Sequence, residues 1–220
     1  MVDSVLSAAG SNAANQAAAA KNKLTTDKTQ FLTLLTAQLK NQDPLSPMDS
    51  TEFTNQLVQY SAVEQQINMN ANLATLITLA QQNVLAAASS YVGKAIQATS
   101  DKAPLQSSQM NASYNLSGNT ASTTIVVRDS AGEVVYAKQG ETQAGKHLFQ
   151  WDGKPVGVQQ MPDGPYTLTV TALGADGKAV DSSTTVYGTV TSATIDPTTN
   201  ETLLNMGAVG VPLSKVVAVG

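Results

Sequence analysis

The side chains that carry most enzyme chemistry are scarce in this chain. It has one histidine, His147, and no cysteine, so a single chain offers neither a histidine-centred triad nor a multi-histidine or thiolate metal site. Asp152, Asp163 and Asp176 each precede a glycine, and we interpret them as turn residues rather than as catalytic or calcium-binding carboxylates. Neither glycine-rich nucleotide-binding motif is present. The sequence therefore predicts no enzyme, no cofactor and no metal site.

Two aromatic residues leave a binding function open. Trp151 and Tyr166, as exposed platforms, would suit a secreted oligomeric adhesin or carbohydrate-binding module with the helices as its oligomerising part. In a small β-sandwich, however, tryptophan is more often a core residue. A third hypothesis, a hydrolase with a helical arm, has no constellation of residues to support it.

Charge and hydropathy exclude two further classes of partner. The formal net charge is −4 over 220 residues, and the lysines are scattered without forming a basic stripe, so we expect no nucleic acid partner. No apolar run approaches the roughly 20 residues that span a membrane, so we expect no membrane insertion.

The chain is organised around residues 31–66, which predict two helices and a hinge. In the first helix one apolar stripe recurs at helical spacing: Phe31, Leu34, Leu35 and Leu39. We expect Asp27 to cap this helix, with Gln30 at its third position. The helix should end near Asn41, because Pro44 disfavours a helical conformation at the residue before it.

The second helix has clear start signals. Asp49 is a good N-cap, Glu52 is its reciprocal partner, and Met48 is placed to pack on Phe53. From Ser50 no glycine or proline occurs until Gly93, which allows a helix of about 40 residues. Its apolar residues change phase near Ile67: Leu57, Tyr60, Val63 and Ile67, then Met69, Leu73, Leu76, Ala80, Val84 and Ala87.

This long helix carries only Glu52 and Glu64 as charges. One interpretation is a helical hairpin packed on its own domain, and the other is a helix shared between subunits. A solvated helix normally carries many more charges, so composition favours the shared helix.

The segments on either side of the helices differ in composition. Residues 1–23 are rich in Ala, Ser and Asn and lack the features of a secretory signal, and we predict a segment that is disordered until it packs on a partner. After Tyr91 alternating patterns with frequent turns predict a sandwich of immunoglobulin or fibronectin type. The expected strands are 123–128, 133–137, 147–151 and 166–172, followed by 185–195, 202–206 and 213–219.

The helical motif resembles a known family. Residues 31–44, FLTLLTAQLKNQDP, followed by Pro47-Met48, are similar to the flagellar hook-capping (hook assembly scaffolding, basal-body rod modification) proteins. The similarity extends through 53–57 and 60–65 and, more weakly, through the β-rich half. Because no single residue beyond Tyr91 matches specifically, we confine the candidate site residues to the helical motif.

The resemblance implies an α+β multi-domain fold with a helical hairpin and an all-β C-terminal half. In that half a small SH3- or tudor-like barrel is interrupted by the sandwich. The expected domains are 1–23, an N-terminal export segment; 24–90, helical oligomerisation; 91–110 with 184–220, the barrel; and 111–183, the immunoglobulin- or fibronectin-III-like sandwich.

The resemblance also implies a function. It is that of a non-enzymatic cap at the distal, extracellular end of the growing hook, which promotes folding and insertion of hook protein and forms a ring of five subunits. Such proteins leave the cytoplasm through the flagellar type III apparatus, whose gate would read Phe31 and Leu35. The remaining candidates are assembly or subunit contacts: Leu34, Leu39, Asn41, Gln42, Asp43, Pro44, Phe53, Leu57 and Tyr60.

Overall fold

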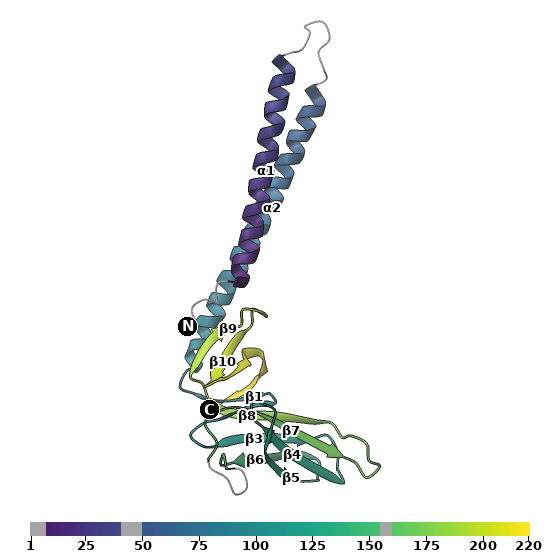
Figure 1. Cartoon of the computed structure of the whole chain (residues 1–220), viewed down its shortest axis with the longest axis vertical. Helices are drawn as coiled ribbons and strands as arrows, with labels where there is room; N and C mark the ends of the chain where they lie inside the picture. The colour runs from purple at the N-terminus through teal and green to yellow at the C-terminus, as the bar shows by residue number, and fades with distance from the viewer. Residues whose placement is uncertain (1–7, 41–49, 155–159) are drawn as a thin grey trace. The chain divides into compact units, whose positions relative to one another are not determined.

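The computed structural model describes residues 8–40, 50–154 and 160–220. They divide into two compact units, Met1–Gln82 and Asn83–Gly220, and each is described by itself. Two helices, α1 (Ala8–Lys40) and α2 (Ser50–Ala88), account for the described part of the first unit, and α2 continues into the second (Figure 1). Neither helix is long and apolar enough, over its described residues, to cross a membrane.

Helix α1 is longer than the sequence motif predicts. It runs without a break through Asp27, so the predicted cap at that residue is wrong. The described part of the segment expected to be disordered, residues 8–23, is helical. The physical reason is that alanine is the strongest helix former and no proline interrupts residues 8–40, so helix that is stabilised from Leu24 onward propagates towards the N-terminus.

The predicted inner ends of the two helices lie at the limits of the described residues. Helix α1 is described as far as Lys40, and α2 is described from Ser50. The capping contacts of Asp49 and Met48 and the hinge at 44–48 lie outside the described residues. Helix α2 gives way to a 3-10 turn, Ser89–Tyr91, before Gly93 takes a φ of +85°.

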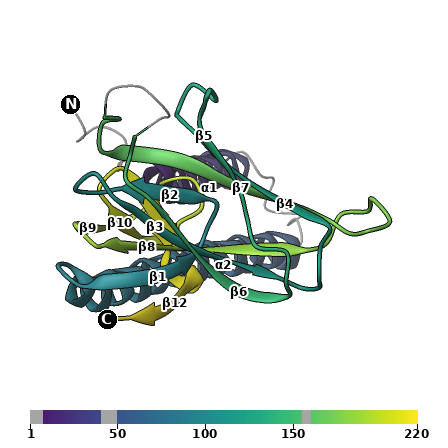
Figure 2. The same cartoon turned by 90° about the horizontal axis from the view of Figure 1, so that it is seen from below.

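Antiparallel strands make up the rest of the second unit. Their bounds are β1 (Ala95–Thr99), β2 (Lys102–Leu105), β3 (Met110–Leu116), β4 (Ser122–Arg128), β5 (Val134–Gln139), β6 (Gly145–Trp151), β7 (Gly164–Leu173), β8 (Ser182–Thr189), β9 (Ser192–Ile195), β10 (Thr202–Met206), β11 (Val209–Pro212) and β12 (Val216–Val219). They form sheets in the orders β12-β1-β8-β3-β6, β2-β7-β4-β5 and β11-β10-β9. The first two are the layers of a sandwich (Figure 2).

Sheet pairing changes two of the expected boundaries. Strand β2 was assigned to the small barrel with residues 91–110, but it pairs with β7 in the four-stranded sheet of the sandwich. Strand β8 pairs with β3 on one side and with β1 on the other, so no boundary at 183/184 separates the two sets of strands. The backbone groups at the edge of a sheet can pair with any strand that reaches them. The pattern of the sequence does not show which strand that is.

The C-terminal strands also differ in detail from the sequence pattern. The predicted run 185–195 is two strands, β8 and β9, and the predicted loop 207–212 contains β11. Gly207, with a φ of +67°, makes the tight turn between β10 and β11. Val209 and Val211 then fill the core of the small sheet, which is why this short run forms a strand.

The core of the β unit is continuous. Phe149 and Trp151 point inward from the same face of β6, and Trp151 lies edge-on to Tyr166 with ring centroids 5.4 Å apart. Tyr114 and Leu204 are also fully buried, one in the sandwich and the other in the small sheet. One apolar cluster therefore includes residues of all three sheets.

The sandwich and the small sheet meet at Gly188 in β8. A Cβ built there lies 2.6 Å from Met206 Sδ and 2.9 Å from Pro104 Cγ, so only glycine fits without movement. Next to Gly188, the side-chain amide of Gln106 pairs with both backbone groups of Thr189. Its Nε2 donates to the carbonyl oxygen of Thr189 at 3.0 Å, and its Oε1 accepts from the Thr189 amide at 2.9 Å. The joint is therefore packed and hydrogen-bonded.

Candidate assembly surface on the helical hairpin

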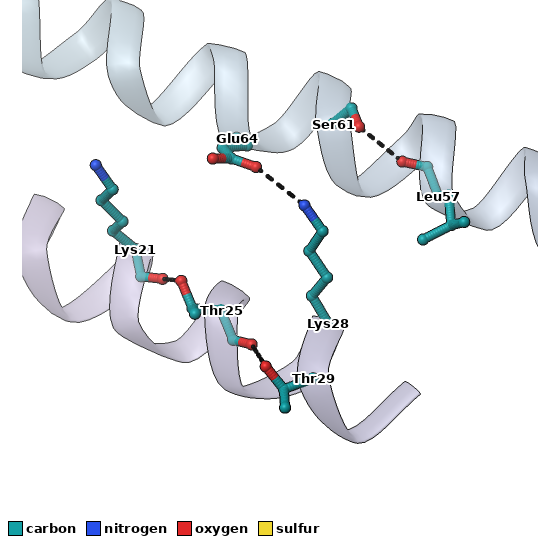
Figure 3. Close-up of polar contacts among 7 residues, drawn as sticks. All are labelled: Lys21, Thr25, Lys28, Thr29, Leu57, Ser61 and Glu64. Carbon is teal, nitrogen blue, oxygen red and sulfur yellow. Dashed lines mark hydrogen bonds and ion pairs between the residues drawn. The ribbon is translucent and has the colours of Figure 1, made fainter. Parts of the chain in front are cut away.

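Helices α1 and α2 run side by side in opposite directions (Figure 1). Two contacts define their register. Lys28 Nζ lies 3.6 Å from Glu64 Oε2 (Figure 3), and the rings of Phe31 and Tyr60 lie 5.8 Å apart between centroids at 49°. From the first contact to the second, the residue number rises by about one turn in α1 and falls by about one turn in α2, which is the register that an antiparallel helix pair requires.

The contact between the helices, called the seam below, follows a heptad pattern. The half-buried positions of α2 in the first unit are spaced alternately by three and four residues, with one interruption at Thr78: Leu57, Tyr60, Glu64, Ile67, Ala71, Ala74 and Gln81. This is the period of a coiled-coil seam. Of the residues whose burial is described, none before Ala88 is fully buried. The seam is therefore narrow and stabilises the hairpin only weakly.

The hydroxyl groups of the hairpin are satisfied within each helix. Thr25 Oγ1 donates to the Lys21 carbonyl oxygen at 2.9 Å, Thr29 Oγ1 donates to that of Thr25 at 2.8 Å, and Ser61 Oγ donates to that of Leu57 at 2.9 Å (Figure 3). Such bonds to the fourth preceding residue leave the hydroxyl without need of an outside partner. These positions add polarity to the surface but not specificity.

Three of the predicted site residues come together at the seam. Phe31, Leu57 and Tyr60 are all half-buried. Leu34 is not part of it, because its side chain is 63% exposed, and the prediction of one stripe containing both Phe31 and Leu34 is wrong on this point. The reason is that α1 faces a single helix, so only a narrow stripe is covered, and Leu34 lies about 60° around the helix from Phe31.

The other predicted residues are placed less fully. Leu35 and Leu39 lie in α1 and Phe53 lies in α2, but their side chains are outside what the structure describes. The segment 41–44, with Asn41, Gln42, Asp43 and Pro44, lies outside the described residues altogether.

Sequence reasoning missed two features of the hairpin. The first is the Lys28–Glu64 pair, because it depends on the register of α1 against α2 and not on a pattern within either helix. The second is that α2 has two apolar faces. Leu57, Tyr60 and Ile67 lie on the seam, whereas Val63 and the apolar residues that the sequence pattern picked out from Met69 onward are exposed. The phase change near Ile67 indicated the second face only in part, because Val63 precedes it.

The residues singled out for chemistry in the β unit have structural roles. His147 Nε2 lies 2.7 Å from the Gln143 carbonyl oxygen, and Asp152 and Asp176 each accept the amide two residues on, at 3.1 Å. Asp163 accepts the amides of two successive residues at 2.7 and 2.9 Å and so fixes the turn between β2 and β3. Among the described residues no three His, Asp or Glu side chains gather into a possible metal site.

The aromatic platforms of the sugar-binding alternative are absent from the surface. Trp151 is 3% exposed, and its Nε1 donates to the Lys154 carbonyl oxygen at 3.0 Å. Tyr166 is 5% exposed, and its hydroxyl donates to the Pro162 carbonyl oxygen at 2.8 Å. Burial of the ring raises the pKa of Tyr166. Both rings are core residues, as the sequence favoured for Trp151, and the exposed platforms that the sugar-binding alternative requires are not found at these two positions.

One hollow of about 350 Å³ lies where β3 and β6 meet beside β5. It is lined by Gln109, Met110, Asn111, Tyr136, Gln150, Trp151 and Asp152. Gln150 Nε2 donates to Asn111 Oδ1 at 3.1 Å across its wall, and Asp152 is held by the turn that follows β6. Because these polar groups pair with one another, the hollow is a weaker candidate site than the helical surface.

Comparison with known proteins gives matches to both units. The family described as "Flagellar hook capping protein - N-terminal region" matches residues 3–75, and the family "FlgD Ig-like domain" matches residues 99–176. "Basal-body rod modification protein FlgD" of Salmonella typhimurium is 30% identical over 156 residues, 66% of each chain. The protein of the same name from Escherichia coli is 30% identical over 154 residues, 66% of this chain and 67% of that one.

A solved structure supports the same relationship. The crystal structure of FlgD from P. aeruginosa is 31% identical, with a TM-score of 0.50, and its match covers 59% of this chain and 98% of that one. The chain spans about two thirds of the length of the curated relatives that it matches.

Proposed function

The chain belongs to the FlgD family of flagellar hook-capping proteins, and on this premise we propose that it is a non-enzymatic scaffold in hook assembly. The observation that carries the proposal is that one chain matches both the hook-capping helical region and the family's Ig-like domain. The scaffold sits at the distal, extracellular end of the hook and promotes folding and insertion of hook protein beneath it.

The helical surface supports a role based on packing and release. Between Glu52 and Lys94 the only charge is Glu64, and the polar positions are mostly Gln, Asn, Ser and Thr. Desolvating an amide costs less than desolvating an unpaired ion, so such a surface suits contacts that are remade as each subunit is added. The narrow seam also favours a role in which the helices bind a partner, because a hairpin that is only weakly stable by itself gains stability from that contact.

The proposed partners are hook protein, other copies of the chain and the flagellar export gate. Subunits form a ring, of five by family resemblance, with the long helix shared between them. Predicted contacts are the site residues of the motif: Leu34, Leu39, Asn41, Gln42, Asp43, Pro44, Phe53, Leu57 and Tyr60.

Export through the type III apparatus is the part of the proposal that Phe31 and Leu35 carry. Replacing Phe31 by alanine should lower the amount of the chain in culture medium without lowering its cellular amount, because the gate reads the chain before it folds. Leu34→Ala is the matched control, since Leu34 lies in the same helix but outside the Phe-x-x-x-Leu pattern. Unchanged secretion of the Phe31→Ala variant would show that this pattern is not the signal.

We also propose that β1 and the strands after the sandwich form the small SH3- or tudor-like barrel of the family. Support comes from β1, which pairs with β12 from the far end of the chain. Strands β2 to β7 are then an insertion between β1 and β8, which lie in one sheet with β3 and β6. No methyl-lysine binding follows from this fold, because a fold does not carry a function by itself.

The capping role is tested by deleting the gene in the source cell. Basal bodies are then examined by electron microscopy while hook protein is assayed in the medium. The proposal expects rods that end without hooks, loss of hook subunits to the medium, and reversal of both defects when the gene is restored. Normal hooks in the deletion strain would contradict it.

A further inference from the structure

The side of α2 away from the seam carries an exposed apolar stripe, the outer stripe. It consists of Met69, Leu73, Leu76, Ile77, Ala80 and Val84. The five large side chains of this set are 43–61% exposed. At about 100° per residue, the outer stripe is centred roughly 125° around the helix from the seam positions of the same stretch. Contact with α1 therefore cannot cover it.

The outer face of α1 differs from this surface. Over Lys21–Lys40 its exposed positions include Lys21, Lys23 and a series of threonines whose hydroxyls bond back to their own helix: Thr25, Thr26, Thr29, Thr33 and Thr36. Exposure of large apolar side chains on the hairpin is thus concentrated on one helix. A contiguous exposed apolar patch on a folded protein marks a contact surface.

The outer stripe is self-complementary. Its successive spacings are 4, 3, 1, 3 and 4 residues, the same in both directions. When two copies of α2 run antiparallel with their centres matched, Leu73 of each copy lies level with Ala80 of the other. Leu76 and Ile77 lie at the centre, where Leu76 of each copy lies level with Ile77 of the other. A large residue opposite a small one packs without a gap, whereas a parallel pair would set Ala80 against Ala80.

Charge does not oppose this pairing. No charged residue occurs between Glu64 and Lys94, so the two stripes approach without like-charge repulsion although the copies are identical. An interface in which the same patch meets itself about a two-fold axis is isologous, and it closes at two copies.

We propose that the free protein pairs with a second copy of itself through the outer stripes of two antiparallel α2 helices. The inference deepens the proposed self-association and rests on it. A pair that closes at two copies cannot be the ring of the cap. The pair is therefore the form that the protein takes before it joins the cap. In this form the second copy covers the outer stripe, until ring formation or hook protein displaces it.

Disulfide cross-linking of the full chain tests the geometry directly, because the chain has no cysteine of its own. In oxidising buffer Ile77→Cys should form a covalent dimer, because residue 77 lies beside the axis. Met69→Cys alone should not, because its two copies lie about 15 residues, or about 22 Å, apart along the helix axis. A mixture of Leu73→Cys and Ala80→Cys should give the heterologous dimer.

Thr33→Cys, at an exposed position of α1 that is not among the predicted contacts, is the matched control and should give no covalent dimer. Efficient linking of Met69→Cys alone would indicate parallel or random contact and overturn the proposal, as would failure of Ile77→Cys to link. Sedimentation of an Ile77→Gln variant, with helix content checked by circular dichroism, should show at least tenfold weaker association than a Thr33→Gln variant. Equal association of the two variants would also overturn the proposal.

These measurements use purified protein and do not depend on hook formation. If cross-linking fails while the deletion strain lacks hooks, the pairing is wrong and the capping role stands. If cross-linking succeeds while hooks are normal, the pairing stands and the capping role is wrong.

Discussion

The β part of the chain buries its apolar side chains, whereas the helical part leaves them on its surface. Every fully buried apolar residue in the described structure lies at or after Ala88, and most of the large exposed ones lie on α1 and α2. The β part therefore has the core of an independently stable unit, and the helical part has the surface of one member of an assembly. One chain can therefore contain both a part with its own buried core and a part whose apolar side chains remain exposed in the single chain.

The largest expected loss of stability comes from a substitution in the core of the β part. Phe149 is 1% exposed, so Phe149→Ala should lower the free energy of unfolding of the β part by about 3–5 kcal/mol, measured by denaturant titration with Trp151 fluorescence. Leu148→Ala, at the neighbouring position and 76% exposed, should change it by less than about 0.5 kcal/mol. If Phe149→Ala does not fold, Phe149→Leu should show a smaller loss in the same direction. Equal effects at the two positions would remove the contrast.

The next effect tests whether the β part is one unit. Gly188→Ala should cost about 1–3 kcal/mol, because the new Cβ meets Met206 of the small sheet and Pro104 of the sandwich. Gly118→Ala is the control, since its Cβ meets only Val180 Cγ1 at 3.9 Å. Denaturant unfolding should remain a single transition in both variants. Separate transitions for the sandwich and the small sheet would show that the joint is not rigid.

A smaller effect is expected in the helical part. Phe31→Ala removes the ring that contacts Tyr60 and should cost about 0.5–1.5 kcal/mol of local stability. Hydrogen exchange of α1 amides should accelerate, while the unfolding midpoint of the β part stays unchanged. Leu34→Ala should leave α1 exchange nearly unaltered. A shift of the β midpoint in the Phe31→Ala variant would show that the two parts depend on each other.

The smallest effect lies in the turn between β9 and β10. Backbone amides of Thr199 and Thr198 donate to the Asp196 carboxylate at 3.0 and 2.7 Å and hold its pKa below the ordinary value. Because the pKa is lowered, the stability that these two hydrogen bonds contribute is present above the ordinary pKa of Asp and is lost as the pH falls through the lowered pKa. Acid titration by NMR should move these two amide resonances together. Asp196→Asn should abolish that movement, and its persistence would assign the titration to another group.

Much of the secondary structure was readable from the sequence because its signals are local. The absence of glycine and proline from Ser50 to Gly93 predicted the long helix α2, and alternating patterns predicted the strand 166–172, which is β7. The N-terminal end of α1 was predicted wrongly because a good local cap, Asp27, lost to continuous helix through an alanine-rich segment.

The helical motif also determined the family and placed Phe31, Leu57 and Tyr60 in one region. It did not determine which side chains face the seam, because helical spacing gives a face only relative to a partner helix. Leu34 and the outer stripe have the same apolar character as the seam residues. Their exposure follows from which side α1 occupies.

The sequence by itself determined composition, charge, the presence of two long helices and strand alternation, all of which depend on neighbouring residues. Only the tertiary structure decided that β1 pairs with β12 and β8, that β2 joins the sandwich, and that α2 has one covered and one open apolar face. Strand pairing and side-chain burial depend on contacts between residues that are far apart in the chain. Because a local sequence pattern does not show which distant residues come into contact, these features are seen only in the tertiary structure.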